Sequence, residues 1–495
     1  KSGGYGRSED LADWEYIPCT TIPTLEDYAP TILPIGDTLY FTTSSGKTQI
    51  FKNAHPEKDT WEAVDTKLTY RLHDPAFYSD EDGKVYMYWG CSDKDPIMGV
   101  EVDPKDGFRA LGEAKALIAH HGDKYGWEVP GKNNEEPRQG WNEGPCMLKY
   151  EGRYYLQYAA PGTQYRIYGD GIYVGDTPLG PFEYVEDNPF SFKPGGFIGG
   201  AGHGHTFQDK YGNYWHVASM IISVRHMFER RLGLFPVAVS SRNGIYAHTV
   251  WSDYPFYIPN RKVDFDKTDL SMGWNLLSYR KPVQASSSLA GYEPGNANDE
   301  QIETWWAAQT GKKGEWLQVD LETPMLVNSI HVNFADHHFK VFALHPPVVY
   351  QFFIEGSADG KKWMNLFDER ENGKDEPHRL FTLNKPMKVR YLRICNAKEM
   401  DGCFSLSGFR VFGKGEGAAS KVTGFRAIRD SEDKRMFRFT WDAQKEATGY
   451  VLRWGTQKDK LTHAVTVFDN QYEARYFNRD SEYYFSITAF NENGN

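Results

Sequence analysis

One local pattern recurs along the first half of the chain and limits the folds open to it. In each copy an apolar strand leads into a turn with glycine and an acidic or amide residue, and then into an aromatic-rich strand. The copies span residues 31–41, 75–89, 147–156, 206–216 and, more weakly, 239–246. Hairpins repeated roughly every 45 to 70 residues are typical of β-propeller blades with variable insertions. We therefore expect an all-β chain in which residues 1–262 form a five-bladed propeller whose first blade is incomplete.

Composition supports a multi-domain β protein and argues against two classes of partner. At 495 residues the chain exceeds what one hydrophobic core usually serves. Its aromatic content of 15% suits β cores and sugar-stacking surfaces. The net charge of −11 comes without a basic stripe, so we do not expect nucleic acid as a partner. No apolar run reaches the length of a membrane span, so none is expected in this chain.

The cysteines do not form a metal-binding pattern. Cys19, Cys91 and Cys146 stand singly and are expected to be small buried hydrophobes. Cys395 and Cys403 flank a polar loop between two strands, so they could form a disulfide in an oxidising compartment or remain free. No spacing of histidine and cysteine suggests zinc.

The residues just before the hairpins are chemically richer than the hairpins themselves. They include carboxylates, histidines and a tyrosine, namely Asp27, Tyr28, His73, Asp74, Glu143 and His203. Because the innermost strand of each propeller blade lines the central channel, these side chains are expected to converge on one axial pocket. Glu143, which precedes a Gly-Pro break, is the first candidate for the acid of an enzyme.

Four of these segments resemble glycoside hydrolase family 43. They are His-Asp-Pro-Ala-Phe at 73–77, Tyr-Met-Tyr-Trp-Gly at 86–90, Asn-Glu-Gly-Pro at 142–145 and Gly-His-Gly at 202–204. That family consists of five-bladed propellers that hydrolyse glycosides with inversion. The resemblance implies that Glu143 is the general acid and that Asp74 orients it and tunes its pKa. An inverting hydrolase also needs an ionised carboxylate that activates water about 6.5 to 9.5 Å from the acid.

That third carboxylate, the general base, has no direct counterpart in the chain. In the family it is an aspartate of the first blade, and it precedes a strand that would lie upstream of Lys1. Asp27 is the only carboxylate before a hairpin that could replace it, and it is a weak substitute. We therefore expect the base upstream of Lys1, with Asp27 in the pocket wall.

Further site residues follow from the same resemblance. His203 corresponds to an axial histidine that holds water or a structural calcium ion, and no cofactor is required. The other candidates for substrate contact are Tyr28, His73, Trp141, Arg225 and Arg231. For the two arginines, salt bridges between blades are the alternative explanation. Asp80, Glu81 and Asp82 are expected to be solvated in a turn, and the insertion 120–138 is expected to form part of the pocket rim.

Two further domains are expected after the propeller. Residues 275–414 resemble a discoidin (coagulation factor V/VIII type C) domain, through Trp-Trp at 305–306, Glu-Trp-Leu-Gln-Val-Asp-Leu at 315–321 and Ser-Gly-Phe-Arg-Val-Phe-Gly at 407–413. Residues 420–495 alternate with period two and resemble a fibronectin type III sandwich with an incomplete last strand. The discoidin resemblance does not name a ligand. Loop candidates for a sugar surface are Tyr292, His337, His338 and Phe339.

Together these features predict an exported, inverting, exo-acting glycosidase. It would remove arabinofuranosyl, xylosyl or related residues from polysaccharide side chains, in an extracellular, periplasmic or cell-surface location. The first alternative is a non-catalytic propeller that only binds carbohydrate. The second is an adhesion protein in which the C-terminal domains carry the function. The oligomeric state is left open.

Overall fold

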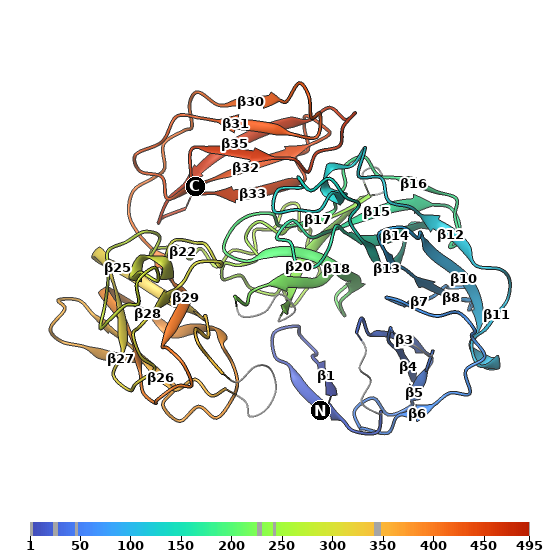
Figure 1. Ribbon diagram of the computed structural model, residues 1–495, viewed down its shortest axis with the longest axis horizontal. Helices are drawn as coiled ribbons and strands as arrows, with labels where there is room; N and C mark the ends of the chain where they lie inside the picture. Colours follow the sequence, from blue (N-terminus) through green and yellow to red (C-terminus); the bar gives the residue numbers. More distant parts are fainter. Residues whose placement is uncertain are drawn as a thin grey trace.

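The computed structural model confirms an all-β protein with a five-bladed propeller and a discoidin-type sandwich (Figure 1). It describes residues 3–22, 28–44, 48–224, 230–240, 244–340 and 348–494. Helical structure there consists of three short 3₁₀ turns, η1 (Pro104–Asp106), η2 (Gly126–Glu128) and η3 (Pro294–Ala297). No helix in these described ranges is long and apolar enough to cross a membrane.

Five antiparallel sheets follow one another along the first half of the chain. The first contains β1 (Gly3–Arg7) and β2 (Glu15–Cys19). The second contains β3 (Thr31–Ile35), β4 (Thr38–Thr42), β5 (Phe51–Asn53) and β6 (Glu62–Ala63). The third contains β7 (Ala76–Ser79), β8 (Val85–Trp89), β10 (Ile97–Asp103), β11 (Arg109–Ala110) and β12 (Lys115–Ile118).

The fourth and fifth sheets complete the propeller. The fourth contains β9 (Cys91–Ser92), β13 (Asn142–Tyr150), β14 (Arg153–Ala160), β15 (Gly169–Gly175), β16 (Phe182–Tyr184) and β17 (Ser191–Phe192). The fifth contains β18 (Gly199–Gln208), β19 (Tyr214–Ile221), β20 (Arg230–Ser240) and β21 (Gly244–Ala247). Four of the predicted hairpins, 31–41, 75–89, 147–156 and 206–216, therefore form the inner strands of successive blades. The weaker copy at 239–246 does not: it spans β20 and β21, the outer strands of the blade that already contains 206–216.

The inner strands β3, β7, β13 and β18 contact one another in that order, and so surround a common channel. The two-stranded first sheet lies between the second and the fifth. Tyr5 packs edge to face on Trp61 at 6.0 Å between ring centroids, while Leu11 packs in the cluster around Trp215. This arrangement brings the residues that precede β7, β13 and β18 to one end of the channel.

The pattern of buried side chains along each strand shows which of its faces are covered. Along β10 buried and half-buried side chains alternate for most of its length, as expected where one face is covered more fully than the other. In β8 all five side chains are buried, because neighbouring blades cover both faces. The predicted solvated turn is wrong at Asp80, which is buried and accepts hydrogen bonds from Lys149 Nζ at 2.8 Å and from the Tyr154 hydroxyl. These bonds join the third and fourth blades.

The second domain is a β-sandwich built on two long strands. Its strands are β22 (Asn275–Leu276), β23 (Val283–Ala285), β24 (Trp306–Ala307), β25 (Trp316–Phe334), β26 (Phe352–Ser357), β27 (Met364–Asp368), β28 (His378–Asn396) and β29 (Ser405–Lys414). Irregular register between β25 and β28 lets the paired strands bend around an apolar core. Cys395 and Cys403 are both buried and unbridged, so the disulfide considered above is not formed.

The third domain consists of two three-stranded antiparallel sheets. One contains β30 (Arg426–Arg429), β31 (Phe437–Thr440) and β34 (Gln471–Ala474). The other contains β32 (Gly449–Gly455), β33 (His463–Val467) and β35 (Tyr484–Phe490). Aromatic side chains from both sheets fill the space between them, including Trp441, Trp454 and Phe477.

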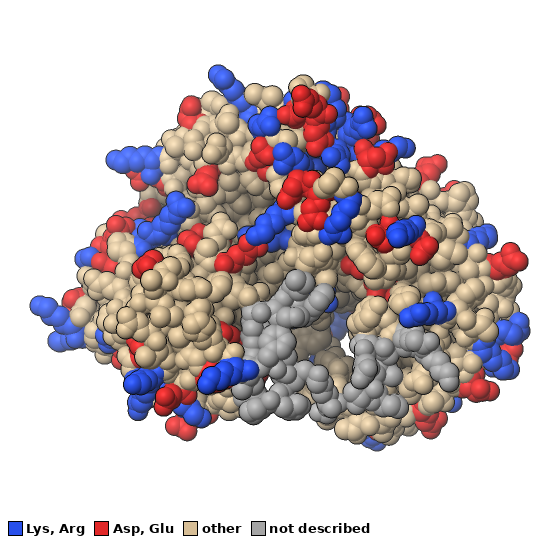
Figure 2. All heavy atoms as spheres, in the orientation of Figure 1, with Lys and Arg blue, Asp and Glu red and all other residues tan. Residues whose placement is uncertain are grey.

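Both C-terminal domains dock on the propeller, as Figure 1 shows. The insertion 120–138, expected at the pocket rim, contacts the third domain. Gly126, in η2, donates a backbone hydrogen bond to the carbonyl of Phe477 at 3.1 Å, so this insertion holds the third domain. Arg410 of the second domain donates to the carbonyl of Asp253 at 2.7 Å. On the face shown in Figure 2, acidic and basic side chains are interspersed.

Candidate active site

Asp74 is almost fully buried. It lies two residues before β7, and Pro75 stands between it and the strand. Its side chain is 2% exposed, and its backbone has a left-handed φ of 49°. Such a φ is uncommon for a residue with a side chain and is seen where surrounding structure enforces it. Ser44 provides that constraint: its Oγ accepts from the Asp74 backbone N–H at 2.8 Å and donates to Oδ1 at 3.3 Å.

Glu143 lies at the start of β13, where the strand is irregular. Its register partner is Ala159 of β14, and a β-bulge follows between Glu143 and Cys146. Such a bulge locally redirects side chains. The Tyr168 hydroxyl donates a hydrogen bond to Oε1 of Glu143, and the Cys91 thiol donates to Oε2 at 3.2 Å. Burial, followed by the charge of Asp74, raises the pKa of Glu143.

His203 completes the group from β18. Its Nδ1 atom lies 3.5 Å from Oδ2 of Asp74, and its φ is 51°. The backbone N–H groups of His203 and Gly204 donate to the two carboxylate oxygens of Asp170 at 2.7 and 2.8 Å. Asp170, which is 1% exposed, also lies 2.8 Å from Nε2 of His216. A buried carboxylate on β15 therefore holds the backbone that presents His203.

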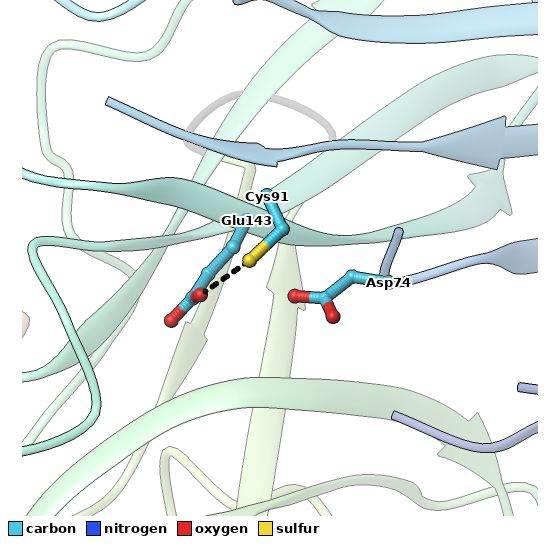
Figure 3. A group of neighbouring side chains, drawn as sticks. All are labelled: Asp74, Cys91 and Glu143. Carbon is cyan, nitrogen blue, oxygen red and sulfur yellow. Dashed lines mark hydrogen bonds between the residues drawn. The ribbon is translucent and has the colours of Figure 1, made fainter. Parts of the chain in front are cut away.

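The structure brings Asp74, Glu143 and His203 together, as the sequence analysis expects. Ligand atoms of Asp74, Cys91 and Glu143 lie within 4.8 Å of one another, and Figure 3 shows the Cys91 thiol between the two carboxyl groups. Calcium prefers six to eight oxygen ligands. Two carboxylates, a thiol and an imidazole fit calcium poorly. The predicted calcium site at His203 therefore gains no support from these ligands.

The other predicted contacts vary in position. The Tyr28 hydroxyl lies 3.4 Å from Nδ1 of His73, next to Asp74, and Tyr28 is 55% exposed. Trp141, two residues before Glu143, is 39% exposed. Both aromatic side chains are therefore accessible, and their roles in substrate binding stay predictions.

Three further residues are predicted to lie in the pocket: Asp27, Arg225 and Arg231. Asp27 and Arg225 lie outside the described residues. Arg231 is exposed on β20, and its charge helps to lower the pKa of His378 in the second domain. The role of Arg231 in substrate binding stays a prediction.

Sequence reasoning missed Cys91, Tyr168 and Asp170. Cys91 is not merely a small buried hydrophobe: it is half-buried, and β9 pairs with β13 so that it lies opposite Glu143. Tyr168 and Asp170 stand outside the repeated hairpins. The only local signal is the acidic Asp170 within an otherwise apolar, glycine-rich strand.

A cavity of about 840 Å³ lies elsewhere, between the fifth blade and the C-terminal domains. Its lining includes Trp251, Trp274 and Arg453. None of the described site residues discussed above lines it. We place the active site at Asp74 and Glu143 because hydrolysis needs an acid, and these two buried carboxyl groups lie within 4.8 Å of each other beside the inner strands of the propeller.

Two family models match parts of the chain. Residues 5–240 match the model of the family described as glycosyl hydrolases family 43. Residues 282–406 match that of the F5/8 type C domain. No curated protein matches the chain.

Several solved structures are similar to the chain. A glycoside hydrolase is 19% identical with a TM-score of 0.46, covering 82% of this chain and 90% of its own. The GH43 protein BlXynB from Bacillus licheniformis is 16% identical with a TM-score of 0.41, covering 98% and 92%. A family 43 arabinoxylan arabinofuranohydrolase from Bacillus subtilis, in complex with cellotetraose, is 15% identical with a TM-score of 0.37, covering 83% and 87%.

Proposed function

We propose that this glycoside hydrolase, whose residues 5–240 form a family 43 domain, acts on the side chains of polysaccharides. It removes terminal arabinofuranosyl, xylosyl or related residues with inversion. The observation that carries the proposal is the buried Glu143, whose pKa is raised by burial and by Asp74. A carboxyl group with a raised pKa keeps its proton to higher pH and can donate it to a leaving glycosidic oxygen.

Asp74 tunes this acid and does not serve as the base. Carboxylate oxygens of Asp74 and Glu143 lie within 4.8 Å of each other. The acid and base of an inverting enzyme stand about 6.5 to 9.5 Å apart, to leave room for water. The base is therefore a third carboxylate, either upstream of Lys1, as the family resemblance suggests, or Asp27.

The remaining residues of the pocket bind the sugar. We assign His203, His73 and Tyr28 to hydrogen bonds with sugar hydroxyls. Nδ1 of His203 lies 3.5 Å from Asp74, and the Tyr28 hydroxyl lies 3.4 Å from Nδ1 of His73, the residue before Asp74. Trp141 offers an exposed aromatic face beside the acid, which suits stacking on a sugar ring. Arg225 and Arg231 are further candidates for the pocket wall.

The C-terminal domains hold the enzyme near its polymer. A discoidin-type domain that binds glycan would raise the local concentration of substrate at the propeller. The third domain is a fibronectin type III-like spacer, supported by its two packed three-stranded sheets. This architecture suits an exported protein at the cell surface, in the periplasm or outside the cell.

Hydrolysis of 4-nitrophenyl α-L-arabinofuranoside, β-D-xyloside and β-D-galactofuranoside by the full-length protein tests the proposal. We expect turnover of at least one substrate, inversion at the anomeric carbon by proton NMR, and a loss of at least about 10²-fold in Glu143→Ala. Glu183→Ala, an exposed position on β16, is the matched control and retains activity.

Other outcomes would change the assignment. Retention of configuration would make Asp74 a nucleophile, because retaining carboxyl groups lie about 5 to 5.5 Å apart. Glycan binding without turnover, unaffected by Glu143→Ala, would instead support the non-catalytic carbohydrate-binding propeller. Loss of all turnover in Asp27→Ala, with binding preserved, would identify Asp27 as the base.

A further inference from the structure

The thiol of Cys91 occupies a position that the chemistry of the reaction does not require in itself. The two-residue strand β9 pairs with the start of β13, which sets Cys91 opposite Glu143. The Sγ atom donates to Oε2 of Glu143 at 3.2 Å, on the side that faces Asp74 (Figure 3). The residue therefore touches the acid directly and stands between the two carboxyl groups.

We propose that Cys91 is a positioning residue for the general acid, which fixes the Oε2 side of the Glu143 carboxyl group and leaves that oxygen able to carry the transferred proton. The proposal rests on the proposed function, because it assumes that Glu143 is the acid. It adds a residue outside the three carboxylates that the sequence motifs indicate.

Two donors of unequal strength fix the Glu143 carboxyl group. The Tyr168 hydroxyl donates to Oε1, and Tyr168 is buried, so Oε1 is held as an acceptor in both protonation states. The proton that Glu143 delivers must then reside on Oε2. A thiol is a weak donor and a weak acceptor, so it can remain beside Oε2 whether or not that oxygen carries the proton.

The environment of Cys91 keeps the thiol neutral. Burial, with the nearby charges of Glu143 and Asp74, raises the pKa of Cys91 far above its ordinary value. A thiolate here would place a second negative charge beside Asp74 and could no longer donate a hydrogen bond to Oε2. A neutral, compact sulfur instead separates the two carboxyl groups and restricts rotation of the Glu143 side chain.

The alternative is that Cys91 only fills space. The two roles differ in how they depend on the leaving group. A glycoside with a good leaving group, such as 4-nitrophenol, needs little proton donation, whereas an alkyl glycoside or a disaccharide needs an aligned acid. A misaligned acid therefore slows the second kind of substrate selectively, while a packing defect slows both alike.

The experiment compares kcat and KM of the full-length protein, Cys91→Ala and Cys91→Ser on a 4-nitrophenyl glycoside and on the corresponding methyl glycoside. For Cys91→Ala we expect kcat on the methyl glycoside to fall by about 10-fold, with less than about a 2-fold change on the nitrophenyl substrate. Cys91→Ser keeps a donor and is expected to recover most of the loss. Melting curves check that both variants fold.

Cys146→Ala is the matched control. It also removes a buried thiol, on β13, but that thiol is hydrogen-bonded to His205 and not to Glu143. Any loss there should be equal for the two substrates. Equal losses on both substrates in the Cys91 variants, or no loss at all, would overturn the positioning role and leave the proposed function standing. A wild-type protein that turned over neither substrate would overturn both.

Discussion

Gly144 faces His203 so closely that a Cβ atom at position 144 would lie 2.5 Å from Cδ2 of the imidazole. Gly144 also has a left-handed φ of 57°, which a side chain disfavours. Glycine at this point therefore does two things: it lets the chain turn after Glu143, and it lets β18 bring His203 against the same turn. The acid and the histidine are packed through a residue that has no side chain.

Gly144→Ala is expected to reduce kcat/KM by about 10²-fold, because either His203 or the Glu143 turn must move by a substantial fraction of an ångström. The protein should still fold. Gly152→Ala is the control, since Gly152 has a φ of 78° in the same hairpin but nothing within 4 Å of the added Cβ. Steady-state kinetics and melting curves make the comparison. Equal effects of the two substitutions would mean that backbone strain alone matters.

Asp74→Asn is expected to move the alkaline limb of the pH profile of kcat/KM to lower pH. The negative charge of Asp74 is the second cause, after burial, of the raised pKa of Glu143. Without that charge Glu143 loses its proton at lower pH, so the active, protonated form disappears earlier as the pH rises. Activity at the optimum should also fall, by about 10-fold or more.

Asp82→Asn, in the exposed turn of the same blade, provides the control for charge removal and should leave the profile unchanged. The profiles would be measured with one substrate under saturating and dilute conditions. If the alkaline limb stayed in place in Asp74→Asn, burial and not the charge of Asp74 would account for the raised pKa of Glu143.

The repeated hairpins made the propeller predictable from sequence. Their period-two alternation and glycine turns are local, and four of the five copies each mark a separate blade. The copy at 239–246 belongs to the same blade as 206–216, which the local pattern alone does not reveal. The meeting of Asp74, Glu143 and His203 was also predictable, because each lies just before or in the first half of an inner strand, and inner strands share one channel. A rule of architecture thus converted three separate motifs into one site.

Contacts that depend on register between distant segments were not predictable in this way. Cys91 reaches Glu143 only because β9 leaves the third blade and pairs with β13 of the fourth. Asp80 is expected to be solvated because it lies in a hairpin turn, yet Lys149 and Tyr154 of the next blade bury it. Periodicity describes the faces of one strand and says nothing about which distant side chain covers them.

Glu128 links the stability of the protein to pH. It is fully buried in η2, where it accepts hydrogen bonds from the Tyr158 hydroxyl and the His121 backbone N–H. Burial raises its pKa from 4.5 to about 7. As the pH rises from 4.5 toward 7, the unfolded chain releases this proton while the folded protein keeps it. The free energy of unfolding therefore falls, by up to about 3 kcal/mol.

Glu128→Gln removes this titration. The amide loses one accepted hydrogen bond, which gives an offset that does not depend on pH. On top of that offset, the melting temperature of the variant relative to wild type should rise between about pH 5 and pH 8. Glu183→Gln, at an exposed position, should show no such trend. A difference in melting temperature that stayed constant with pH would contradict the assignment.

Arg410 anchors the second domain to the propeller through a buried ionic network. Its side chain is 1% exposed, and Nε and Nη2 donate to the two carboxylate oxygens of Glu300 at 2.8 and 2.9 Å. Its Nη1 atom donates to the carbonyl oxygen of Asp253, whose carboxylate also lies 3.2 Å from Nζ of Lys193. Two carboxylates, Asp253 and Glu300, are thus buried together with two cations, Lys193 and Arg410.

Arg410→Met leaves Glu300 buried without its partner, and we expect it to destabilise the protein by about 3 to 5 kcal/mol. The double variant Arg410→Met/Glu300→Met removes both charges and should recover much of the loss, because the desolvation cost of Glu300 disappears with it. Arg370→Met, which breaks an exposed pair with Asp368, should cost less than about 1 kcal/mol.

Thermal melting and limited proteolysis of the segment that joins the two domains, residues 248–274, report the effect. A double variant no more stable than Arg410→Met would show that Arg410 acts by packing against Phe197 and Phe412, and not through its charge.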